Sequence, residues 1–253
     1  MEPRERRMQR PRPNPDAGLR LICLPYSGGR AAAFKGLAAE LPGDVELCAV
    51  ELPGHGRRLR EKPRTCLRPL VEEVTDVLIE QVRPPFVLLG YSLGALLAFE
   101  VARELARDRR PGPAALFVAA SGAPHRPSTG PQIHDLPKAE LVEQLVRLDS
   151  SRNAPLEHED LVDVMLPVVR ADLTAVETYV YEPGPPLDCP LVAFGGRDDP
   201  SLPRSELAAW AEQTAGDFSV ILLAGGHFFL HSSQASFARV LTAELERLLD
   251  GPC

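Results

Sequence analysis

Six short runs of nearly continuous apolar residues, separated by segments with helical periodicity, constrain the fold of this chain most strongly. The runs lie at residues 19–25, 45–52, 86–91, 114–121, 190–196 and 218–224. Strands of this kind are buried on both faces, as in parallel sheets covered by helices. The helical patterns lie at 31–41, 67–83, 93–108, 203–215 and 233–249. The alternation predicts an α/β fold with a doubly wound, mostly parallel sheet.

The alternation of strands and helices is interrupted once. Residues 125–187 contain two helical patterns, at 137–149 and 158–181, and no strand candidate. Insertions of this length in an α/β sheet are usually functional and commonly form a lid. We therefore expect a helical lid insertion at about 125–187.

The length and composition of the chain predict a single folded domain. A chain of 253 residues with 44% hydrophobic side chains can bury a sizeable core, and we expect one domain over 18–253. Residues 1–17 are rich in Arg and Pro, which predicts a disordered leader. The net charge of −7 argues against nucleic acid as a partner. No apolar run approaches the ~20 residues that a membrane-spanning helix needs.

The five cysteines predict a protein with reduced thiols and no metal. They are scattered along the chain, without C-x-x-C spacing and without a nearby pair of histidines. This pattern suits neither a disulfide framework nor a metal site. The apolar run after Arg6 and Arg7 is too short for an export signal. We therefore expect a cytoplasmic protein.

A G-x-S-x-G motif centred on Ser92 is the strongest chemical signal in the sequence. The strand predicted at 86–91 runs directly into Ser92, and a helical pattern begins directly after it, as in a nucleophile elbow. Gly90 and Gly94 have no side chains, so the strand and the helix can approach closely and leave the serine hydroxyl exposed. The alternative is a small residue in a tight turn. We take Ser92 as the candidate nucleophile.

A serine nucleophile needs a base that takes its proton and a carboxylate that orients this base. His227 lies in a glycine-hinged loop between the last predicted strand and the last helix, where hydrolases with the chain order Ser, Asp, His carry their base. His231 is its rival. Asp198 and Asp199 both follow the strand at 190–196. We favour Asp198, which is closer to the strand end, and expect the other acid in a turn or cap.

Two backbone amides are the candidates for an oxyanion hole. One is the N–H of Leu93, directly after the nucleophile. The other comes from the loop LPYSGGR after the first strand, where Gly28 and Gly29 make the chain tight enough to aim an amide inward.

Five segments together resemble the type II thioesterases that accompany polyketide synthases and non-ribosomal peptide synthetases. The segments are CLPYSGG, ELPGHGRR, GYSLGALLAFEVAREL, GGRDDP and GGHFFL, and the resemblance covers roughly residues 19–250. It implies an α/β-hydrolase fold with a helical lid, and an editing enzyme that hydrolyses acyl groups from the phosphopantetheine of acyl or peptidyl carrier proteins. It also assigns the acid to Asp198 and the second oxyanion amide to Ser27, with Tyr26 just before it.

The chemistry that this resemblance implies needs no cofactor and no metal. His227 deprotonates Ser92, an acyl-serine intermediate forms, and water then hydrolyses it. The family usually has histidine where this sequence has Tyr26 and Tyr91. Neither position belongs to the triad, so we expect these departures to bear on acyl selectivity near the pocket.

Other functions remain open at this point. The same fold also serves a chain-terminating medium-chain acyl-carrier-protein thioesterase or a generic ester hydrolase. A different class is a non-catalytic module that binds carrier proteins. The sequence does not predict the length of the acyl group. Apolar lid residues either line an acyl channel or pack the lid on the core, and examples are Leu141, Leu145, Val164 and Val168.

A cluster of arginines follows the strand predicted at 45–52, at the edge of the sheet where ligands bind in open α/β folds. Arg57, Arg58 and Arg60 are candidates for docking a carrier protein that is acidic around its pantetheine. The alternative is a solvated loop with no partner.

Overall fold

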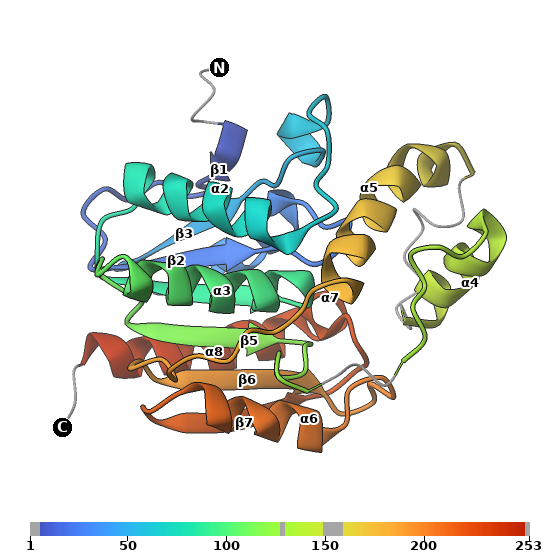
Figure 1. Cartoon of the computed structure of the whole chain (residues 1–253). Coiled ribbons are helices and arrows are strands. Elements are labelled where there is room, and N and C mark those ends of the chain that lie inside the picture. The colour runs from blue at the N-terminus through green and yellow to red at the C-terminus, as the bar shows by residue number, and fades with distance from the viewer. Residues whose placement is uncertain (1–5, 127–129, 149–158, 251–253) are drawn as a thin grey trace.

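The computed structural model describes residues 6–126, 130–148 and 159–250, and these contain one seven-stranded sheet. The strands are β1 (Met8–Gln9), β2 (Leu19–Leu24), β3 (Val45–Val50), β4 (Phe86–Tyr91), β5 (Ala115–Ala119), β6 (Leu191–Gly196) and β7 (Phe218–Leu223). Their order is β1-β3-β2-β4-β5-β6-β7, and every neighbouring pair except β1 and β3 is parallel. The six predicted strands and the doubly wound, mostly parallel sheet are confirmed (Figure 1).

Helices cover both faces of the sheet, as Figure 1 shows. The α-helices are α2 (Leu67–Gln81), α3 (Leu93–Arg107), α4 (Lys138–Leu148), α5 (Glu159–Glu177), α6 (Arg204–Ala208), α7 (Phe229–Ser232) and α8 (Gln234–Leu249). Apolar residues of α2, α3 and α6 pack on one face, and those of α7 and α8 pack on the other. Strands β3, β4, β5 and β6 are buried along their whole length, which explains their continuous apolar runs, whereas the edge strand β7 is only partly buried.

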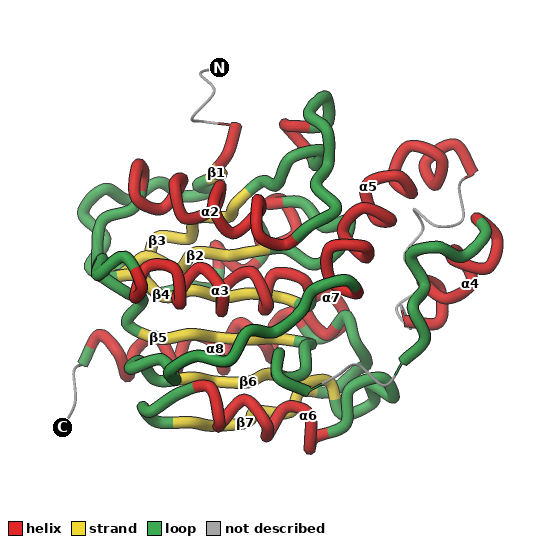
Figure 2. The backbone as a smooth tube through the Cα atoms, viewed as in Figure 1, coloured by secondary structure: helices red, strands yellow, loops and turns green. Residues whose placement is uncertain are grey.

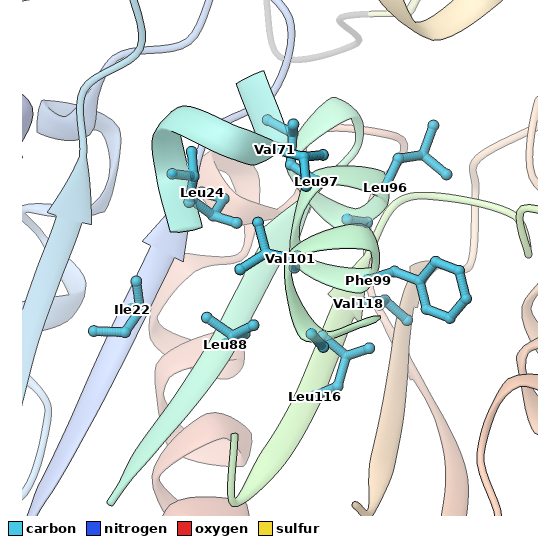
Figure 3. Close-up of a cluster of buried hydrophobic side chains, with 14 of the residues drawn as sticks. Ile22, Leu24, Val71, Leu88, Leu96, Leu97, Phe99, Val101, Leu116 and Val118 are labelled. Carbon is cyan, nitrogen blue, oxygen red and sulfur yellow. The ribbon is translucent and has the colours of Figure 1, made fainter. Parts of the chain in front are cut away.

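Alternation along β4 divides its side chains between the two faces. Leu88 belongs to the cluster under α2 and α3, together with Leu97 and Val101 of α3 (Figure 3). Val87 and Leu89 belong to the cluster under α8. Each such side chain contributes about 2 kcal/mol on burial, so the strand that leads into Ser92 is among the most firmly held parts of the chain.

Two helices predicted from periodicity are shorter or tighter than expected. Residues 31–41 form two 3₁₀ turns, η1 (Ala31–Phe34) and η2 (Leu37–Ala39), in place of an α-helix. Residues 203–215 form α6 followed by a 3₁₀ turn, η5 (Ala209–Gln213). Both segments still bury the predicted apolar residues, because a single short turn is enough to direct them to the sheet.

The prediction of a disordered leader at 1–17 is wrong for its described part, residues 6–17. Strand β1 pairs antiparallel with β3, and Met8 is only 3% exposed. Arg10 and Arg12 donate side-chain hydrogen bonds to the backbone of Gln81 and Ala38. A strand of two residues has no periodic signal, and arginines that bind carbonyl groups look in sequence like arginines in solvent.

Helices α4 and α5 are the two predicted within the insertion at 125–187. They lie beyond the carboxyl ends of the strands, at the right-hand edge in Figures 1 and 2. Leu141 of α4 packs against Val162 and Leu166 of α5 in a small cluster apart from the main core. That this unit acts as a lid remains a prediction.

Candidate active site

Ser92 occupies a sharp turn between β4 and α3. Its φ of 53° and ψ of −113° lie outside the regions that residues with side chains ordinarily adopt, and such strain is typical of functional sites. A Cβ atom at Gly90 would lie 2.0 Å from the carbonyl oxygen of Gly94, and one at Gly94 would lie 2.1 Å from that of Leu24. The two flanking glycines are therefore required by the close approach of strand, helix and neighbouring strand.

His227 is the histidine that the structure brings to Ser92. It lies in the loop between β7 and α7, and its Nε2 is 3.4 Å from the Ser92 hydroxyl oxygen. Its Nδ1 is 2.9 Å from Oδ2 of Asp199. Since a carboxylate only accepts, Nδ1 carries the proton of the neutral ring, and Nε2 is left to accept from Ser92. The rival, His231, has its Nε2 2.8 Å from the hydroxyl of Tyr26.

The expectation that Asp198 pairs with His227 is wrong, because that contact belongs to Asp199. Asp198 is exposed, and its Oδ2 accepts the amide of Gly225 at 3.1 Å. The two side chains leave the turn after β6 in different directions, and only the second enters the site. Proximity to the strand end was therefore the wrong criterion.

The carboxylate of Asp199 is held ionised. Burial raises its pKa, but the hydrogen bond with His227 and two from Ser201 outweigh burial, so that the pKa falls below its ordinary value. The amide and the hydroxyl of Ser201 both donate to Oδ1, at 2.9 and 2.6 Å. Oδ2 is thereby left to the histidine, and the carboxylate can stabilise an imidazolium as it forms.

Tyr91, the residue before the nucleophile, is fully buried beneath the loop that carries His227. Its hydroxyl donates to the backbone carbonyl of His227 and accepts the amide of Leu230 at 3.4 Å. The ring of Tyr26 stands edge-on to that of Tyr91, with centroids 5.9 Å apart. That the two tyrosines bear on acyl selectivity stays a prediction, and their contacts with this loop leave no signal in the sequence.

The loop after β2 holds the second candidate oxyanion donor. The amide of Gly28 donates to Oδ2 of Asp172 at 2.7 Å, and the amide of Gly29 donates to the carbonyl of Tyr26 at 2.7 Å. These two amides are engaged within the protein, and an amide of Tyr26 or Ser27 stays the predicted second donor. The amide of Leu93 lies at the N-terminus of α3, where the first N–H groups of a helix have no partner within it.

Asp172 also binds His55, a histidine in the loop after β3. His55 is 2% exposed, and its Nε2 lies 2.8 Å from Oδ2 of Asp172. The two residues are 117 positions apart, and no local pattern pairs them.

The arginine cluster after β3 is only partly available to a partner. Arg58 is 5% exposed; its side chain donates to Glu61 and to the backbone carbonyl of Glu51, and it forms an ion pair with Glu73. It is therefore a structural residue, and the docking hypothesis is wrong for it. Arg57 and Arg60 are exposed.

Features that would point to other chemistry are absent from the part of the chain that the structure describes. No group of three or more His, Cys, Asp or Glu side chains is arranged to hold a metal ion within 6–126, 130–148 and 159–250. In the same ranges Cys23, Cys48, Cys66 and Cys189 are free thiols. None of the described helices is long and apolar enough to span a membrane.

Comparison with known proteins places this chain among thioesterases. The family model for the thioesterase domain matches residues 19–245. Gramicidin S biosynthesis protein GrsT of Aneurinibacillus migulanus is 36% identical over 236 residues, 93% of this chain and 92% of that protein. The type II thioesterase BorB from the borrelidin biosynthetic cluster is 38% identical, with a TM-score of 0.87 over 95% of this chain and 98% of BorB. RedJ, from the prodiginine pathway of Streptomyces coelicolor, is 41% identical, with a TM-score of 0.85 over 90% and 86% of the two chains.

Proposed function

We propose that Ser92, His227 and Asp199 are the catalytic triad of this chain, and that the chain removes acyl groups from carrier proteins. The chain belongs to the thioesterase family and is a type II thioesterase of polyketide and non-ribosomal peptide pathways. Membership of this family makes the chain a hydrolase of acyl thioesters. The triad and the carrier-bound substrate are the proposal.

One observation carries the triad. Nε2 of His227 faces the Ser92 hydroxyl at 3.4 Å while Nδ1 faces Asp199 at 2.9 Å, and Ser92 occupies the strained turn of a strand–turn–helix unit. Nucleophile, base and orienting acid thus form one line of hydrogen bonds. The distance to the serine is long for a hydrogen bond, as is common before substrate tightens the site.

The first half-reaction forms an acyl-enzyme. Nε2 of His227 takes the proton of Ser92 as the serine oxygen attacks the thioester carbonyl carbon. The tetrahedral oxyanion accepts hydrogen bonds from the amide of Leu93 and from one amide of Tyr26 or Ser27, each contributing about 3 kcal/mol to the barrier reduction. The C–S bond then breaks, and the sulfur takes the proton from the imidazolium of His227. The thiol leaves, and the acyl group stays on Ser92 as an ester.

The second half-reaction restores the enzyme by the same groups. His227 takes a proton from a water molecule, which attacks the acyl-serine carbonyl. Collapse of the second tetrahedral intermediate breaks the bond to the serine oxygen, and His227 returns the proton to Ser92. The carboxylic acid leaves. In both half-reactions His227 takes up and returns every proton that is transferred, so the chemistry requires no cofactor.

The substrate is inferred from the relatives. Polyketide synthases and non-ribosomal peptide synthetases hold their intermediates as thioesters on the phosphopantetheine of carrier proteins. GrsT is named for the biosynthesis of gramicidin S, and BorB is a type II thioesterase from the borrelidin biosynthetic cluster. We infer that this chain meets the same thioesters, clears stalled or wrongly primed acyl groups from a synthase, and works in the cytoplasm beside it.

The experiment combines active-site labelling with a substrate panel. A fluorophosphonate probe should label the wild type and fail to label Ser92→Ala. The wild type should then hydrolyse acyl-carrier protein with a higher kcat/KM than acyl-coenzyme A, and both faster than a simple ester. Labelling without a preference for thioesters would favour a generic ester hydrolase. A marked preference for one medium chain length would favour a chain-terminating enzyme. Absence of labelling would favour a binding module.

A further inference from the structure

A carboxylate of helix α5, in the predicted lid, reaches the loop that carries the candidate oxyanion amides. Asp172 is 1% exposed, and its Oδ2 accepts the amide of Gly28 at 2.7 Å. The same oxygen lies 2.8 Å from Nε2 of His55, in the loop after β3. One buried oxygen therefore joins three segments: helix α5, the loop after β2 and the loop after β3.

The hydrogen bonds of His55 favour a protonated ring paired with the carboxylate of Asp172. Its Nδ1 lies 3.0 Å from the carbonyl oxygen of Pro53, which can only accept, so Nδ1 carries a proton. Its Nε2 faces the carboxylate of Asp172, so it donates as well. Burial lowers the pKa of His55, but the bonds with Asp172 and Pro53 and the charge of Glu51 outweigh burial and raise that pKa. The imidazolium holds Asp172 in one orientation.

A second contact of α5, one turn before Asp172, fixes the same glycine. Gly28 has a φ of +73°, and a Cβ atom there would lie 2.5 Å from Cγ2 of Val169. The helix therefore covers the loop too closely for any side chain at this position. Packing against Val169 and the hydrogen bond that the Gly28 amide donates to Asp172 together define where the Gly28 peptide points.

We propose that Asp172 is a positioning residue for the oxyanion hole. By accepting the Gly28 amide, it fixes the peptide plane between Ser27 and Gly28, and with it the direction of the amides that precede this plane. This inference rests on the proposed function, because an oxyanion forms only if Ser92 attacks a carbonyl. Preorganised donors contribute most when they do not have to reorient during the reaction.

Glu177 supplies a matched control on the same helix. Its carboxylate accepts the amides of Ile133 and His134 at 3.0 and 3.2 Å, so it too anchors α5 to the chain through backbone N–H groups. These contacts are with segment 132–136 and not with the loop after β2. A change at Glu177 therefore loosens α5 without removing the hydrogen bond to Gly28.

The experiment compares Asp172→Ala, Asp172→Asn and Glu177→Gln with the wild type. We would measure kcat and KM for an acyl-N-acetylcysteamine thioester, the Kd of an alkylboronic acid that forms a tetrahedral anionic adduct with Ser92, and Tm. For Asp172→Ala we expect kcat to fall about 10- to 100-fold and the boronate to bind correspondingly more weakly, with KM within about threefold. Asp172→Asn should recover part of both losses, since its amide oxygen can accept from Gly28.

The control separates positioning from mere support of the fold. Glu177→Gln should keep kcat and boronate affinity within about twofold, even if its Tm falls as far as that of Asp172→Ala. The proposal is overturned if both variants lose kcat alike, or if Asp172→Ala loses only Tm. If Asp172→Ala does not fold, Asp172→Asn decides: parallel losses of kcat and boronate affinity support the proposal, and unchanged values overturn it. A wild type without thioesterase activity would instead overturn the proposed function.

Discussion

Two histidine–aspartate pairs in this protein have hydrogen bonds of similar length, but they differ in what the second nitrogen of the histidine contacts. In the pair His227–Asp199, Nδ1 binds the carboxylate at 2.9 Å and Nε2 faces Ser92. In the pair His55–Asp172, the carboxylate binds Nε2 at 2.8 Å, and Nδ1 is bound to a backbone carbonyl. The first histidine directs one nitrogen to the hydroxyl of the proposed nucleophile, whereas both nitrogens of the second are engaged by the carboxylate and the backbone carbonyl. Reactivity thus depends on the partner of the second nitrogen.

The two pairs also differ in where they lie relative to the sheet. Asp199 and His227 are 28 residues apart, on the turns after the neighbouring strands β6 and β7. Asp172 and His55 are 117 residues apart and join helix α5 to the loop after β3. The first pair is placed by the sheet itself, while the second holds together elements that the sheet does not fix.

The largest expected effect distinguishes the two acids after β6. Asp199→Asn should lower kcat/KM by about 10⁴, because an amide in place of the carboxylate favours the wrong tautomer of His227 and cannot stabilise the imidazolium. Asp198→Asn should lower it less than about threefold, since the amide oxygen can still accept from Gly225. Steady-state kinetics with one acyl thioester checks both. If the two variants exchanged ranks, the pair His227–Asp199 would not be the reactive one.

A smaller effect is expected at the hydroxyl that supports the reactive pair. Tyr91→Phe removes the donor to the backbone carbonyl of His227 while keeping the ring in the core. A lost hydrogen bond of this kind corresponds to about 1 kcal/mol, or a five- to tenfold lower kcat. The KM values for thioesters of different chain length should change together. A selective change for one chain length would instead support the expectation that Tyr91 governs acyl selectivity.

The buried pair predicts a pH dependence of stability. The pKa of His55 in the folded protein is raised above its ordinary value. The contribution of His55 to the free energy of unfolding is therefore fully present at a pH below the ordinary pKa, and it is lost as the pH rises through the raised pKa. The difference in Tm between the wild type and His55→Gln should therefore shrink as the pH increases from near neutral. For a chain of this length, each kcal/mol corresponds to about 2–4 °C. A difference independent of pH would show that His55 is not charged in the folded protein.

The sequence predicted those parts of the site that local pattern and chain order define. Ser92 follows from the glycines that its turn requires, and His227 follows from its place after the last strand. The choice between Asp198 and Asp199 depends on the direction in which each side chain leaves a turn, which no spacing encodes. The contacts of Asp172 could not be predicted for a different reason, because its partners are far away in sequence and its helical surroundings match an ordinary amphipathic pattern.

The smallest expected effect concerns the exposed arginines of the loop after β3, in which His55 and Arg58 are buried. With these two residues buried, Arg57 and Arg60 are the members of the cluster that remain exposed to an acidic carrier protein. Arg57→Glu combined with Arg60→Glu should raise KM for acyl-carrier protein about two- to fivefold at low salt, because exposed charges mainly affect encounter and are screened. The effect should shrink as ionic strength increases, and hydrolysis of acyl-N-acetylcysteamine should stay unchanged. Equal changes with both substrates, or none with either, would remove this loop from the docking surface and leave the His55–Asp172 pair with an internal role alone.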